Sequence, residues 1–418
     1  MKPDLHPEIF LSDDPEEFRR RLLQWFDREK RSLPWRVRRS LYGTWISEVM
    51  LQQTTVAVVV PYWEKFMAVF GDVRSLAAAD LAEVLAQWSG LGYYRRARQL
   101  HEAARIVVDR LGGELPRDRA GWLALPGIGP YASGAIASIG LNEAVPAVDA
   151  NARRVLSRWL MADPQVQGSL KPAQLESIGG TLVDRGRPGD WNEAVMELGA
   201  LICGAKDPRC PDCPMLGLCR AGTAGTAARI PPPAPAPETR RVRLGLLVLR
   251  WRDHVLLMPP GSSPVAVPEG TGAPVRADVS GLHKGLWGLP STSWLPDPAP
   301  RSSPWPGSIW RPWLESLPLR GGLPAGRDPR PLGTFRHAIT RYRLGVEVHG
   351  LRLPDALRVR TGGASGDRGI EELGVDSTSS GPWEVGSAGA VFGPLPGLDL
   401  PVSNLVRKGL SLAAKSGI

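Results

Sequence analysis

Hydrophobic residues in the first half of the chain recur at intervals of three and four, as they do along one face of a helix. The first such set follows an acidic cap: Phe18, Leu22, Trp25 and Phe26 after Asp13-Asp14-Pro15. The same spacing predicts four more helices, separated by Gly and Pro, over residues 45–70, 76–88, 97–111 and 150–160. No strand-like alternation occurs before about Asn192, so we expect an all-α domain here.

The pattern changes after residue 220. Residues 221–240 are rich in Gly, Thr, Ala and Pro, and because such a stretch cannot bury a core it predicts a linker. We therefore expect three parts in the chain. They are a helical domain over residues 1–220, the linker over residues 221–240, and a smaller α+β domain over residues 241–418.

Beyond the linker, hydrophobic and polar residues alternate as they do in β-strands. Residues 242–249 and 255–257 flank Arg252-Asp253, which predicts a hairpin. A second alternating stretch predicts a half-buried strand, with Tyr342, Leu344, Val346 and Val348 set against Arg341, Arg343, Glu347 and His349. Two Pro- and Gly-rich segments predict long loops, at residues 294–330 and 358–381.

The net charge of the chain indicates what kind of partner it binds. The 418 residues include 51 Lys and Arg against 42 Asp and Glu, a net charge of +9, which favours a polyanion: nucleic acid first, a membrane surface second. The N-terminus is acidic, and the longest apolar run, residues 132–141, is interrupted by Ser and Gly. We therefore expect a soluble, cytoplasmic chain that spans no membrane, associated with the nucleoid if the source is bacterial.

Residues 125–132 read Leu-Pro-Gly-Ile-Gly-Pro-Tyr-Ala, a turn with two glycines just before a predicted helix. Gly127 and Gly129 let the backbone approach a phosphate, Pro130 suits the first turn of a helix, and free helix amides favour an anion. Such a hairpin grips DNA by its backbone. A tight turn between two packed helices is the alternative.

All four cysteines lie in one short stretch, which favours a metal site over disulfides. Their spacing is Cys203-x6-Cys210-x2-Cys213-x5-Cys219. Four thiolates suit either zinc or an iron–sulfur cluster. Zinc modules commonly use two CxxC pairs and this stretch has one, so iron–sulfur is favoured.

Together, the hairpin, the Asp149 that follows it and the cysteine stretch resemble the endonuclease III superfamily, whose iron–sulfur loop has the same cysteine spacing. Residues 45–54, Trp-Ile-Ser-Glu-Val-Met-Leu-Gln-Gln-Thr, narrow the resemblance to the MutY-type adenine DNA glycosylases. Gly-Leu-Gly-Tyr-Tyr at residues 90–94 and Trp-Asn-Glu-Ala at residues 191–194 also match. The resemblance implies a helix-hairpin-helix domain carrying a 4Fe–4S cluster.

The resemblance also implies a pair of carboxyl groups with opposite protonation states. Adenine leaves readily only when its ring is protonated, and the remaining sugar approaches an oxocarbenium ion. The resemblance makes Glu48 the acid and Asp149 the ionised carboxylate. Because Glu48 lies in an apolar helical run, we expect desolvation to raise its pKa. The alternatives are a surface carboxylate for Glu48 and a helix N-cap for Asp149, and capping is compatible with catalysis.

Tyr131 bears on the type of reaction. Bifunctional relatives carry a nucleophilic Lys at this hairpin position. This chain has Tyr131 there and no Lys between Lys65 and Lys171, so we expect hydrolysis by water. By resemblance, Asn151 orients Asp149 and the water, and Tyr131 lines the sugar side of the pocket.

A base inside a duplex must be flipped out before it can be removed. By resemblance, Gln53 and Tyr93 fill the gap or unstack the opposite base, with Gln52 beside them in the DNA-binding set. Residues implied to line the adenine pocket are Arg36, Leu51 and Glu193.

Residues 284–290, Lys-Gly-Leu-Trp-Gly-Leu-Pro, resemble the GLWxxP segment of the MutT-like (Nudix-fold) domain of MutY enzymes. No catalytic REUxEExGU helix follows, so this domain is expected to recognise a base, 8-oxoguanine in the family. The family's Phe-Ser-His contact corresponds to Phe335-Arg336-His337, with Arg336 in place of Ser. Arg336 could hydrogen-bond the lesion or contact a phosphate, and Phe335 and His337 could be ordinary strand-edge residues.

The sequence therefore predicts a monomeric, monofunctional DNA glycosylase of base excision repair. Its substrate would be double-stranded DNA with adenine opposite 8-oxoguanine or guanine. Two alternatives remain: a bifunctional glycosylase and AP lyase acting on oxidised pyrimidines, and a non-catalytic DNA-lesion binding protein.

Overall fold

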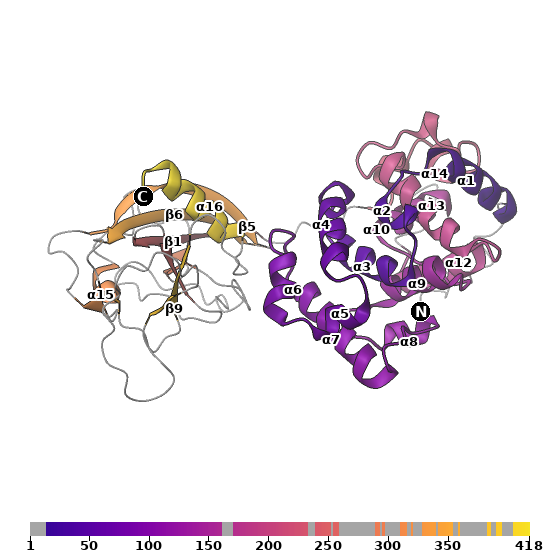
Figure 1. The fold of residues 1–418 in the computed structure, drawn as a ribbon. Helices are drawn as coiled ribbons and strands as arrows, with labels where there is room; N and C mark the ends of the chain where they lie inside the picture. Colours follow the sequence, from indigo (N-terminus) through magenta and orange to yellow (C-terminus); the bar gives the residue numbers. More distant parts are fainter. Residues whose placement is uncertain are drawn as a thin grey trace, which may run out of the picture. The chain divides into compact units, whose positions relative to one another are not determined.

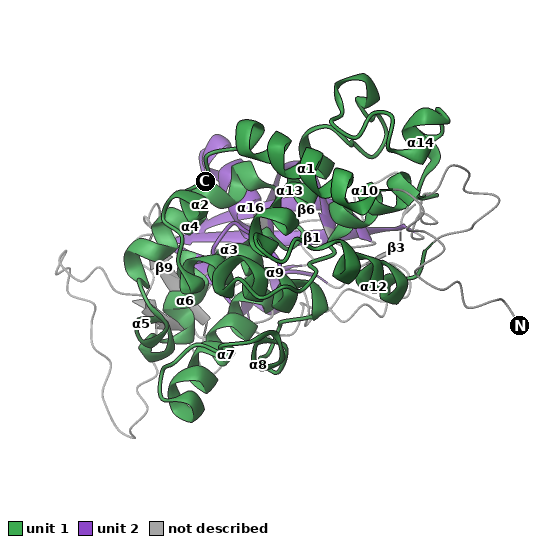
Figure 2. Cartoon of the chain, turned by 90° about the vertical axis from the view of Figure 1, so that its right-hand side faces the viewer, with its two compact units in different colours: residues 1–87, 95–235 green, residues 88–94, 236–418 purple. Residues whose placement is uncertain are grey.

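A computed structural model of the chain describes the following residues: 14–160, 170–232, 239–251, 254–258, 289–292, 295–296, 310–315, 319–320, 328–339, 342–353, 358–359, 383–385, 390–394 and 404–418. The chain forms two compact units (Figure 2), one of residues 1–87 and 95–235, the other of residues 88–94 and 236–418. Within the described ranges, every helix is too short or too polar to cross a bilayer.

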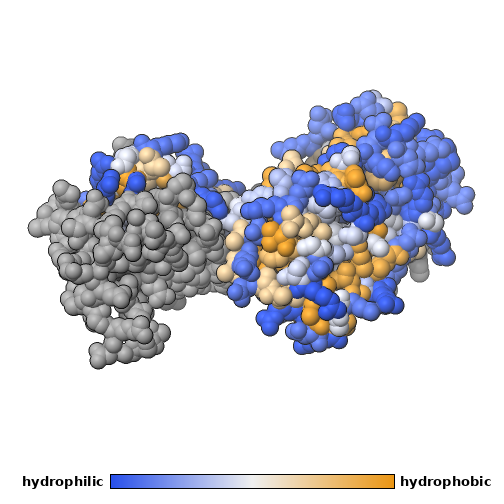
Figure 3. Space-filling view, in the orientation of Figure 1, coloured by the Kyte–Doolittle hydropathy of each residue, from blue (hydrophilic) through white to orange (hydrophobic). Residues whose placement is uncertain are grey.

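The first unit is helical throughout its described residues (Figure 1), as the sequence predicted. Its elements are α1 (Pro15–Glu29), α2 (Pro34–Val37), α3 (Leu41–Leu51), α4 (Val56–Val69), α5 (Val73–Ala78), α6 (Leu81–Gln87), α7 (Arg95–Leu111), α8 (Arg119–Leu123), α9 (Pro130–Leu141), α10 (Ala150–Leu160), α12 (Pro172–Leu182), α13 (Pro188–Leu201), η2 (Cys210–Asp212), α14 (Arg220–Thr223) and η3 (Ala227–Arg229). Hydrophilic residues cover most of the face of this unit seen in Figure 3, with hydrophobic residues in groups between them.

The predicted start of the first helix and the bounds of α10 are confirmed. The side chain of Asp14 caps α1 by accepting hydrogen bonds from the amides of Glu16 and Glu17, at 3.0 and 3.1 Å. Residues 150–160 form α10 as expected.

Two predicted helices were wrong in their extent. Residues 45–70 form α3 and α4 with a break between them, where Gln53 adopts a left-handed backbone with φ of 59°. Residues 76–88 likewise contain the end of α5 and all of α6, separated at Ala79, which is extended. In both cases the hydrophobic period continues across the break, so periodicity alone does not reveal it.

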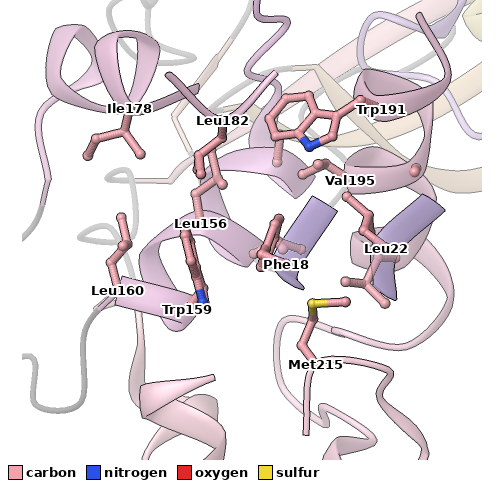
Figure 4. Close-up of a cluster of buried hydrophobic side chains, with 14 of the residues drawn as sticks. Phe18, Leu22, Leu156, Trp159, Leu160, Ile178, Leu182, Trp191, Val195 and Met215 are labelled. Atoms are coloured by element: carbon pink, nitrogen blue, oxygen red, sulfur yellow. The ribbon is translucent and has the colours of Figure 1, made fainter. Parts of the chain in front are cut away.

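Figure 4 shows the core formed by α1, α10, α12 and α13 in the first unit. The rings of Phe18 and Trp159 lie 4.3 Å apart between centroids, and Trp191 is also fully buried. Large buried aromatic residues contribute much of the apolar area that stabilises such a core. The half-buried cysteines pack against the same cluster, so the core supports the cysteine loop.

Asn192 on α13 fixes the segment between α9 and α10. Its Oδ1 accepts a hydrogen bond from the amide of Ala147 at 2.8 Å, and its Nδ2 donates to Ser138 Oγ and to the Val145 carbonyl. Asn192 is fully buried, so these hydrogen bonds are strongly directional constraints. They hold the backbone two residues before Asp149.

The same segment lies directly on α9 at Gly134. A Cβ built on Gly134 would lie 2.2 Å from the Pro146 carbonyl oxygen, which is backbone and cannot move aside cheaply. Gly134 therefore allows a close approach that a side chain would prevent.

We expect Gly134→Ala to lower the free energy of unfolding by roughly 1–3 kcal/mol because it overpacks this contact. Urea unfolding measures the change. Gly180→Ala is the matched control, since it lies in α12 with its nearest neighbouring atom 4.0 Å from the new Cβ. That variant should be unchanged or stabilised by up to about 1 kcal/mol. Equal effects of the two substitutions would contradict the importance of the Gly134 contact.

The second unit is built on a seven-stranded sheet with strand order β5-β6-β1-β2-β9-β8, and β3 pairs with β1. Its elements are β1 (Arg240–Trp251), β2 (His254–Leu257), β3 (Leu295–Pro296), α15 (Arg311–Glu315), β4 (Leu319–Arg320), β5 (Arg330–Ile339), β6 (Tyr342–Leu353), β7 (Arg358–Val359), β8 (Trp383–Val385), β9 (Ala390–Pro394) and α16 (Asn404–Lys415). β4 and β7 form a separate two-stranded sheet. Helix α16 packs on β5, β6 and β1 (Figure 1).

The predicted hairpin is confirmed, because β1 pairs antiparallel with β2, with Arg250 opposite Val255. Its turn, Arg252-Asp253, lies outside the described residues, as do residues 284–288. The expected strand at residues 342–348 is confirmed as part of β6. The expected loop at residues 294–330 contains the short elements β3, α15 and β4 among its described residues.

The expected half-buried alternation in β6 is wrong at Glu347 and His349. Both are buried, 7% and 1% exposed, whereas the alternation predicted that they lie on the exposed, polar side of the strand. His349 Nε2 and Glu347 Oε1 are 3.1 Å apart, and Arg243 Nη2 lies 3.4 Å from Glu347 Oε2. Because the Glu347 carboxylate is paired with Arg243 and His349, the strand can bury it.

Candidate functional site

Glu48 lies in the middle of α3, where the side chains are almost all buried, and is itself 5% exposed. Tyr131 Oη, from the first turn of α9, donates a hydrogen bond of 2.6 Å to Glu48 Oε2. Burial raises the pKa of Glu48 to about 7, although the Tyr131 hydrogen bond acts in the opposite direction. The direction agrees with the sequence prediction, and it places the carboxyl near half-protonation at neutral pH.

Asp149 lies just before α10 and caps it. Its Oδ1 accepts a hydrogen bond of 2.6 Å from the Ala152 amide, and its Oδ2 accepts one of 2.8 Å from Asn151 Nδ2. Burial raises the pKa of Asp149, while these donors act to lower it. The charge of Asp149 also raises the pKa values of Glu48 and Tyr131, so the three groups share one electrostatic site.

A buried charge network adjoins this site. Glu193 on α13 accepts hydrogen bonds from Arg36 Nε at 2.6 Å and Arg39 Nη2 at 2.5 Å. Glu197, one helical turn further, accepts hydrogen bonds from Arg31 and Arg36. Burial would raise the pKa of Glu197, but these arginines bring it down to about 2.

The sequence prediction included Arg36 and Glu193 and missed Arg31, Arg39 and Glu197. The spacing of Glu193 and Glu197 by four residues on one helix was an available signal, because such residues share a face. Their arginine partners lie more than 150 positions away in the chain, at sequence separations of 154 to 166. No local pattern connects positions so far apart.

The end of α3 is held by Arg96 from α7, which is 7% exposed. Arg96 Nη1 donates to the carbonyls of Val49 and Met50, at 3.0 and 2.7 Å, and also to that of Gln52. These carbonyls have no partner within the helix, so a buried cation satisfies them. Arg96 thereby fixes the segment after Leu51, and sequence reasoning did not find it.

The two residues expected to enter the DNA stack share an unusual backbone. Among the described residues other than glycine, positive φ occurs at Gln53 (59°), Tyr93 (49°) and Asn142 (58°). For Gln and Tyr this conformation is strained, and such strain gathers at functional sites. Tyr93 is also 52% exposed, which is high for a large aromatic side chain.

The predicted hairpin precedes α9. Gly127 has a φ of 79°, and Gly129 is the N-cap residue of α9, with Pro130 in the first turn as expected. A Cβ on Gly129 would meet no atom within 4 Å. Among the side chains that the structure describes, none caps the first amides of α9, which are therefore available to an anion approaching at Gly129.

Cys203, Cys210, Cys213 and Cys219 line one partly open pocket, together with Arg158. Burial raises the pKa values of Cys210, Cys213 and Cys219. Within the described part of the chain, no three His, Cys, Asp or Glu side chains converge closely enough to hold a metal ion. The donor set nevertheless fits a four-thiolate centre, because four cysteine sulfurs border the same space.

Two arginines of α10 tie the cysteine loop to the rest of the unit. Arg158 is 1% exposed and donates a hydrogen bond of 3.1 Å to Cys203 Sγ. It also donates hydrogen bonds to the carbonyls of Gly204, Ala205 and Ile230. Arg154 donates to the Cys203 carbonyl at 2.7 Å and to Asn151 Oδ1 at 2.9 Å. Since Asn151 binds Asp149, a continuous chain of hydrogen bonds runs from the cysteine loop to the carboxylate.

In the second unit, Phe335, Arg336 and His337 lie on β5. Arg336 is exposed, whereas Phe335 and His337 are half-buried beside Lys408 of α16, whose Nζ is 5.8 Å from the Phe335 ring centroid. Burial lowers the pKa of His337, and the charge of Lys408 lowers it further. The three residues therefore do not present one common surface.

Residues 46–177 match the family of HhH-GPD superfamily base excision DNA repair proteins. The chain is 38% identical over 381 residues to the adenine DNA glycosylase of Homo sapiens, covering 82% of this chain and 68% of that protein. It is 36% identical over 392 residues to that of Rattus norvegicus, covering 84% and 74%. A solved thermostable thymine-DNA glycosylase is similar with a TM-score of 0.47 and 30% identity, over 50% of this chain and 96% of that chain.

With the hairpin before α9, the buried carboxyl groups and this family match, the chain is a helix-hairpin-helix DNA glycosylase of base excision repair. Its similarity extends over most of both mammalian relatives. The chain belongs to the adenine DNA glycosylase family, which confirms the assignment made from residues 45–54 and 90–94.

Glu48 should make the stability of the fold depend on pH. The pKa of Glu48 rises from 4.5 to about 7 on folding. Its contribution to the free energy of unfolding is therefore complete below pH 4.5 and is lost as the pH rises toward and through 7. A shift of this size corresponds to at most about 3 kcal/mol. Glu48→Gln cannot ionise, so relative to the unaltered protein it should gain stability between pH 5 and pH 8. Urea unfolding at both pH values measures this gain, with the exposed Glu102→Gln on α7 as control, and a constant difference would contradict it.

Proposed function

We propose that this adenine DNA glycosylase hydrolyses the N-glycosidic bond of adenine paired with 8-oxoguanine or guanine in double-stranded DNA, acting as a monomer and without lyase chemistry. The observation that carries the proposal is the buried Glu48 carboxyl, with a pKa of about 7, hydrogen-bonded to Tyr131 and electrostatically coupled to Asp149. Such a pair of carboxyl groups suits the protonation of a leaving group and the stabilisation of a cation.

In this mechanism, protonated Glu48 donates its proton to the ring of an extruded adenine. The bond between the sugar carbon and the base nitrogen then breaks, and its electron pair leaves with adenine. Asp149, held by Asn151 and the Ala152 amide, stabilises the resulting oxocarbenium ion with its negative charge. Water attacks the sugar carbon, loses a proton, and leaves an abasic site.

Tyr131 supports hydrolysis of the glycosidic bond without a following strand-cleavage step. A hairpin lysine would form a Schiff base with the sugar and lead to strand cleavage. The phenol of Tyr131 instead donates to Glu48, and burial raises its pKa well above the ordinary value. Tyr131 therefore stays a neutral hydrogen-bond donor that positions the acid beside the sugar.

The walls of the adenine pocket are assigned to Arg36, Leu51 and Glu193. Because Arg36 and Glu193 neutralise one another, they offer polar edges to a base without a net buried charge. Gln53 and Tyr93 are assigned to the space vacated by the flipped base, with Gln52 beside them. Their strained backbones and the exposure of Tyr93 support this role.

The hairpin is assigned to the DNA backbone. Gly127 and Gly129 allow a phosphate to approach the open amides of α9, which gives binding without base recognition. The net charge of +9 favours the same polyanion. The second unit, by the resemblance of residues 284–290 to Nudix-like domains, is assigned to recognition of the base opposite adenine. Phe335, Arg336 and His337 of β5 are its candidate residues, although Arg336 does not share a surface with the other two.

We also propose that Cys203, Cys210, Cys213 and Cys219 hold a 4Fe–4S cluster. The cluster would fix the loop over residues 203–219 through four iron–thiolate bonds. The pocket shared by the cysteines and the hydrogen bond from Arg158 to Cys203 Sγ support this assignment. Through Arg154 and Asn151, the order of this loop would also support Asp149.

Glu48→Gln tests the reaction. It keeps the shape of the side chain and removes the proton donor, so we expect base removal to fall by at least roughly 100-fold while binding to a duplex with adenine opposite 8-oxoguanine changes little. Abasic sites are measured as strand breaks after alkali, with Glu102→Gln as control. Breaks without alkali in the unaltered protein would instead indicate a lyase, and binding without abasic sites would indicate a lesion-binding protein.

Metal analysis tests the cluster independently of activity. Protein purified without oxygen should contain about four iron atoms and four sulfide ions per chain, with visible absorbance that Cys213→Ser diminishes. Ser177→Ala is the control, since Ser177 is an exposed residue of α12 outside the cysteine stretch. Stoichiometric zinc with no iron would show that the four cysteines form a zinc site.

A further inference from the structure

One arginine at the start of α8 connects the hairpin to the helices around it. Arg119 is the first residue of α8, and it precedes the hairpin of residues 125–129. Asp118 caps this helix by accepting a hydrogen bond of 2.7 Å from the Gly121 amide. Because the cap fixes the backbone here, the side chain of Arg119 starts from a defined point.

The guanidinium group of Arg119 reaches the first turn of α9. Its Nη2 donates a hydrogen bond of 3.2 Å to the Pro130 carbonyl, and its Nε lies 3.5 Å from Ser133 Oγ. Ser133 is fully buried, and its hydroxyl also donates to the Pro130 carbonyl, at 3.0 Å. Two side chains therefore hold the carbonyl of the first residue of α9.

The same guanidinium group is tied to the core of the helical unit. Arg119 Nη2 also donates a hydrogen bond to Glu176 Oε1 on α12. Two neighbours of Glu176 on that helix, Leu175 and Ile178, are buried in the core cluster, in which Figure 4 labels Ile178. Arg119 therefore joins the first turn of α9 to a helix that is anchored in the core.

The backbone of Arg119 holds the other end of α9. Its amide donates a hydrogen bond of 2.8 Å to Glu143 Oε2, and Glu143 follows Asn142, the C-cap residue of α9. One residue thus contacts α9 at its first turn through a side chain and just beyond its last turn through a backbone amide. A tilt or slide of α9 against α8 would break at least one of these hydrogen bonds.

The orientation of α9 matters because its first turn carries two groups of the candidate site. The amides that follow Gly129 are available to an anion, and Tyr131 Oη donates to Glu48 at 2.6 Å. Hydrogen bonds weaken steeply as their angle departs from linear, so a small tilt of this turn would misdirect its donors.

We propose that Arg119 is a positioning residue for DNA binding, which holds the hairpin and the first turn of α9 so that their amides face a phosphate; this rests on the proposed role of the hairpin in binding the DNA backbone. Arg119 acts through α9 and does not bind the phosphate itself. Its side chain is 22% exposed and is engaged by Glu176 and by the Pro130 carbonyl.

Hydrogen exchange of the full chain without DNA tests the structural part of the proposal. Arg119→Met keeps a long side chain and removes its hydrogen bonds. We expect the amides of residues 127–133 to exchange about twofold to fivefold faster in this variant. Arg117→Met is the matched control, because Arg117 is an exposed arginine of the same segment that pairs with the exposed Glu114. Its exchange rates should equal those of the unaltered protein.

Binding to duplex DNA over a range of salt concentrations tests the functional part. These variants are made in the Glu48→Gln background, so that base removal does not alter the ligand. Arg119→Met should weaken binding to mispaired and undamaged duplexes by the same factor, about twofold to fivefold. The slope of log affinity against log salt should stay unchanged, because no phosphate contact is removed. Arg117→Met should match the Glu48→Gln protein in affinity and slope.

Glu176→Met separates positioning from simple charge. It removes one negative charge from the protein, and this change alone would strengthen binding to DNA. It also removes the anchor of Arg119 on α12, so the proposal expects weaker binding, in the same direction as for Arg119→Met. Tighter binding would show that the ion pair contributes only its charge.

Two further results would overturn the proposal. A salt slope reduced by about one in Arg119→Met would make Arg119 a direct phosphate ligand. Equal exchange rates in the Arg119 and Arg117 variants would show that Arg119 does not hold the hairpin. Faster exchange with unchanged affinity would instead show that Arg119 holds a hairpin that does not bind DNA, and the proposed role of the hairpin would then fail as well.

Discussion

The site depends on keeping one carboxyl group out of water. Glu48 occupies a position on α3 whose neighbours are almost all buried, and its surroundings offer a phenol in place of solvent. Desolvation is the main cause of the raised pKa of Glu48, so this pKa depends on how tightly α3 is packed. A change that let water reach this helix would lower the pKa of Glu48 and leave less of it protonated at neutral pH, without any substitution of Glu48 itself.

The rest of the helical unit holds a second carboxyl group, that of Asp149, in place. Asn192 fixes residues 145–147, Gly134 lets that segment lie on α9, and the start of α10 then presents Asp149. Arg154 continues the support from Asn151 to the cysteine loop. Elements distant in the chain therefore converge on a small volume through buried polar contacts, which are costly to leave unsatisfied and so define a single arrangement.

Much of the fold could be predicted from local sequence patterns. The features that could not be predicted depend on contacts between residues far apart in the chain. The helices with caps or strong period, α1 and α10, were predicted with their starts, whereas the break at Gln53 was hidden because the hydrophobic period continues through it. Glu48, Tyr131 and Asp149 were found through motifs, yet the hydrogen bond that joins Glu48 to Tyr131 spans 83 positions. Arg96 and Glu197 were missed, because their partners are set by tertiary packing. Glu347 and His349 were expected on the polar side of a half-buried strand, since alternation cannot reveal that the two side chains will pair beside Trp310.

Arg96 gives α3 a further property. By binding the carbonyls at the end of that helix, Arg96 anchors the helical stretch from Glu48 to Leu51 and the turn at Gln52 that follows it. A helix advances about 1.5 Å and turns about 100° per residue. The spacing between the acid and the residue that follows the helix is therefore a fixed length, and one residue inserted between them would rotate the two out of phase even if every other contact survived.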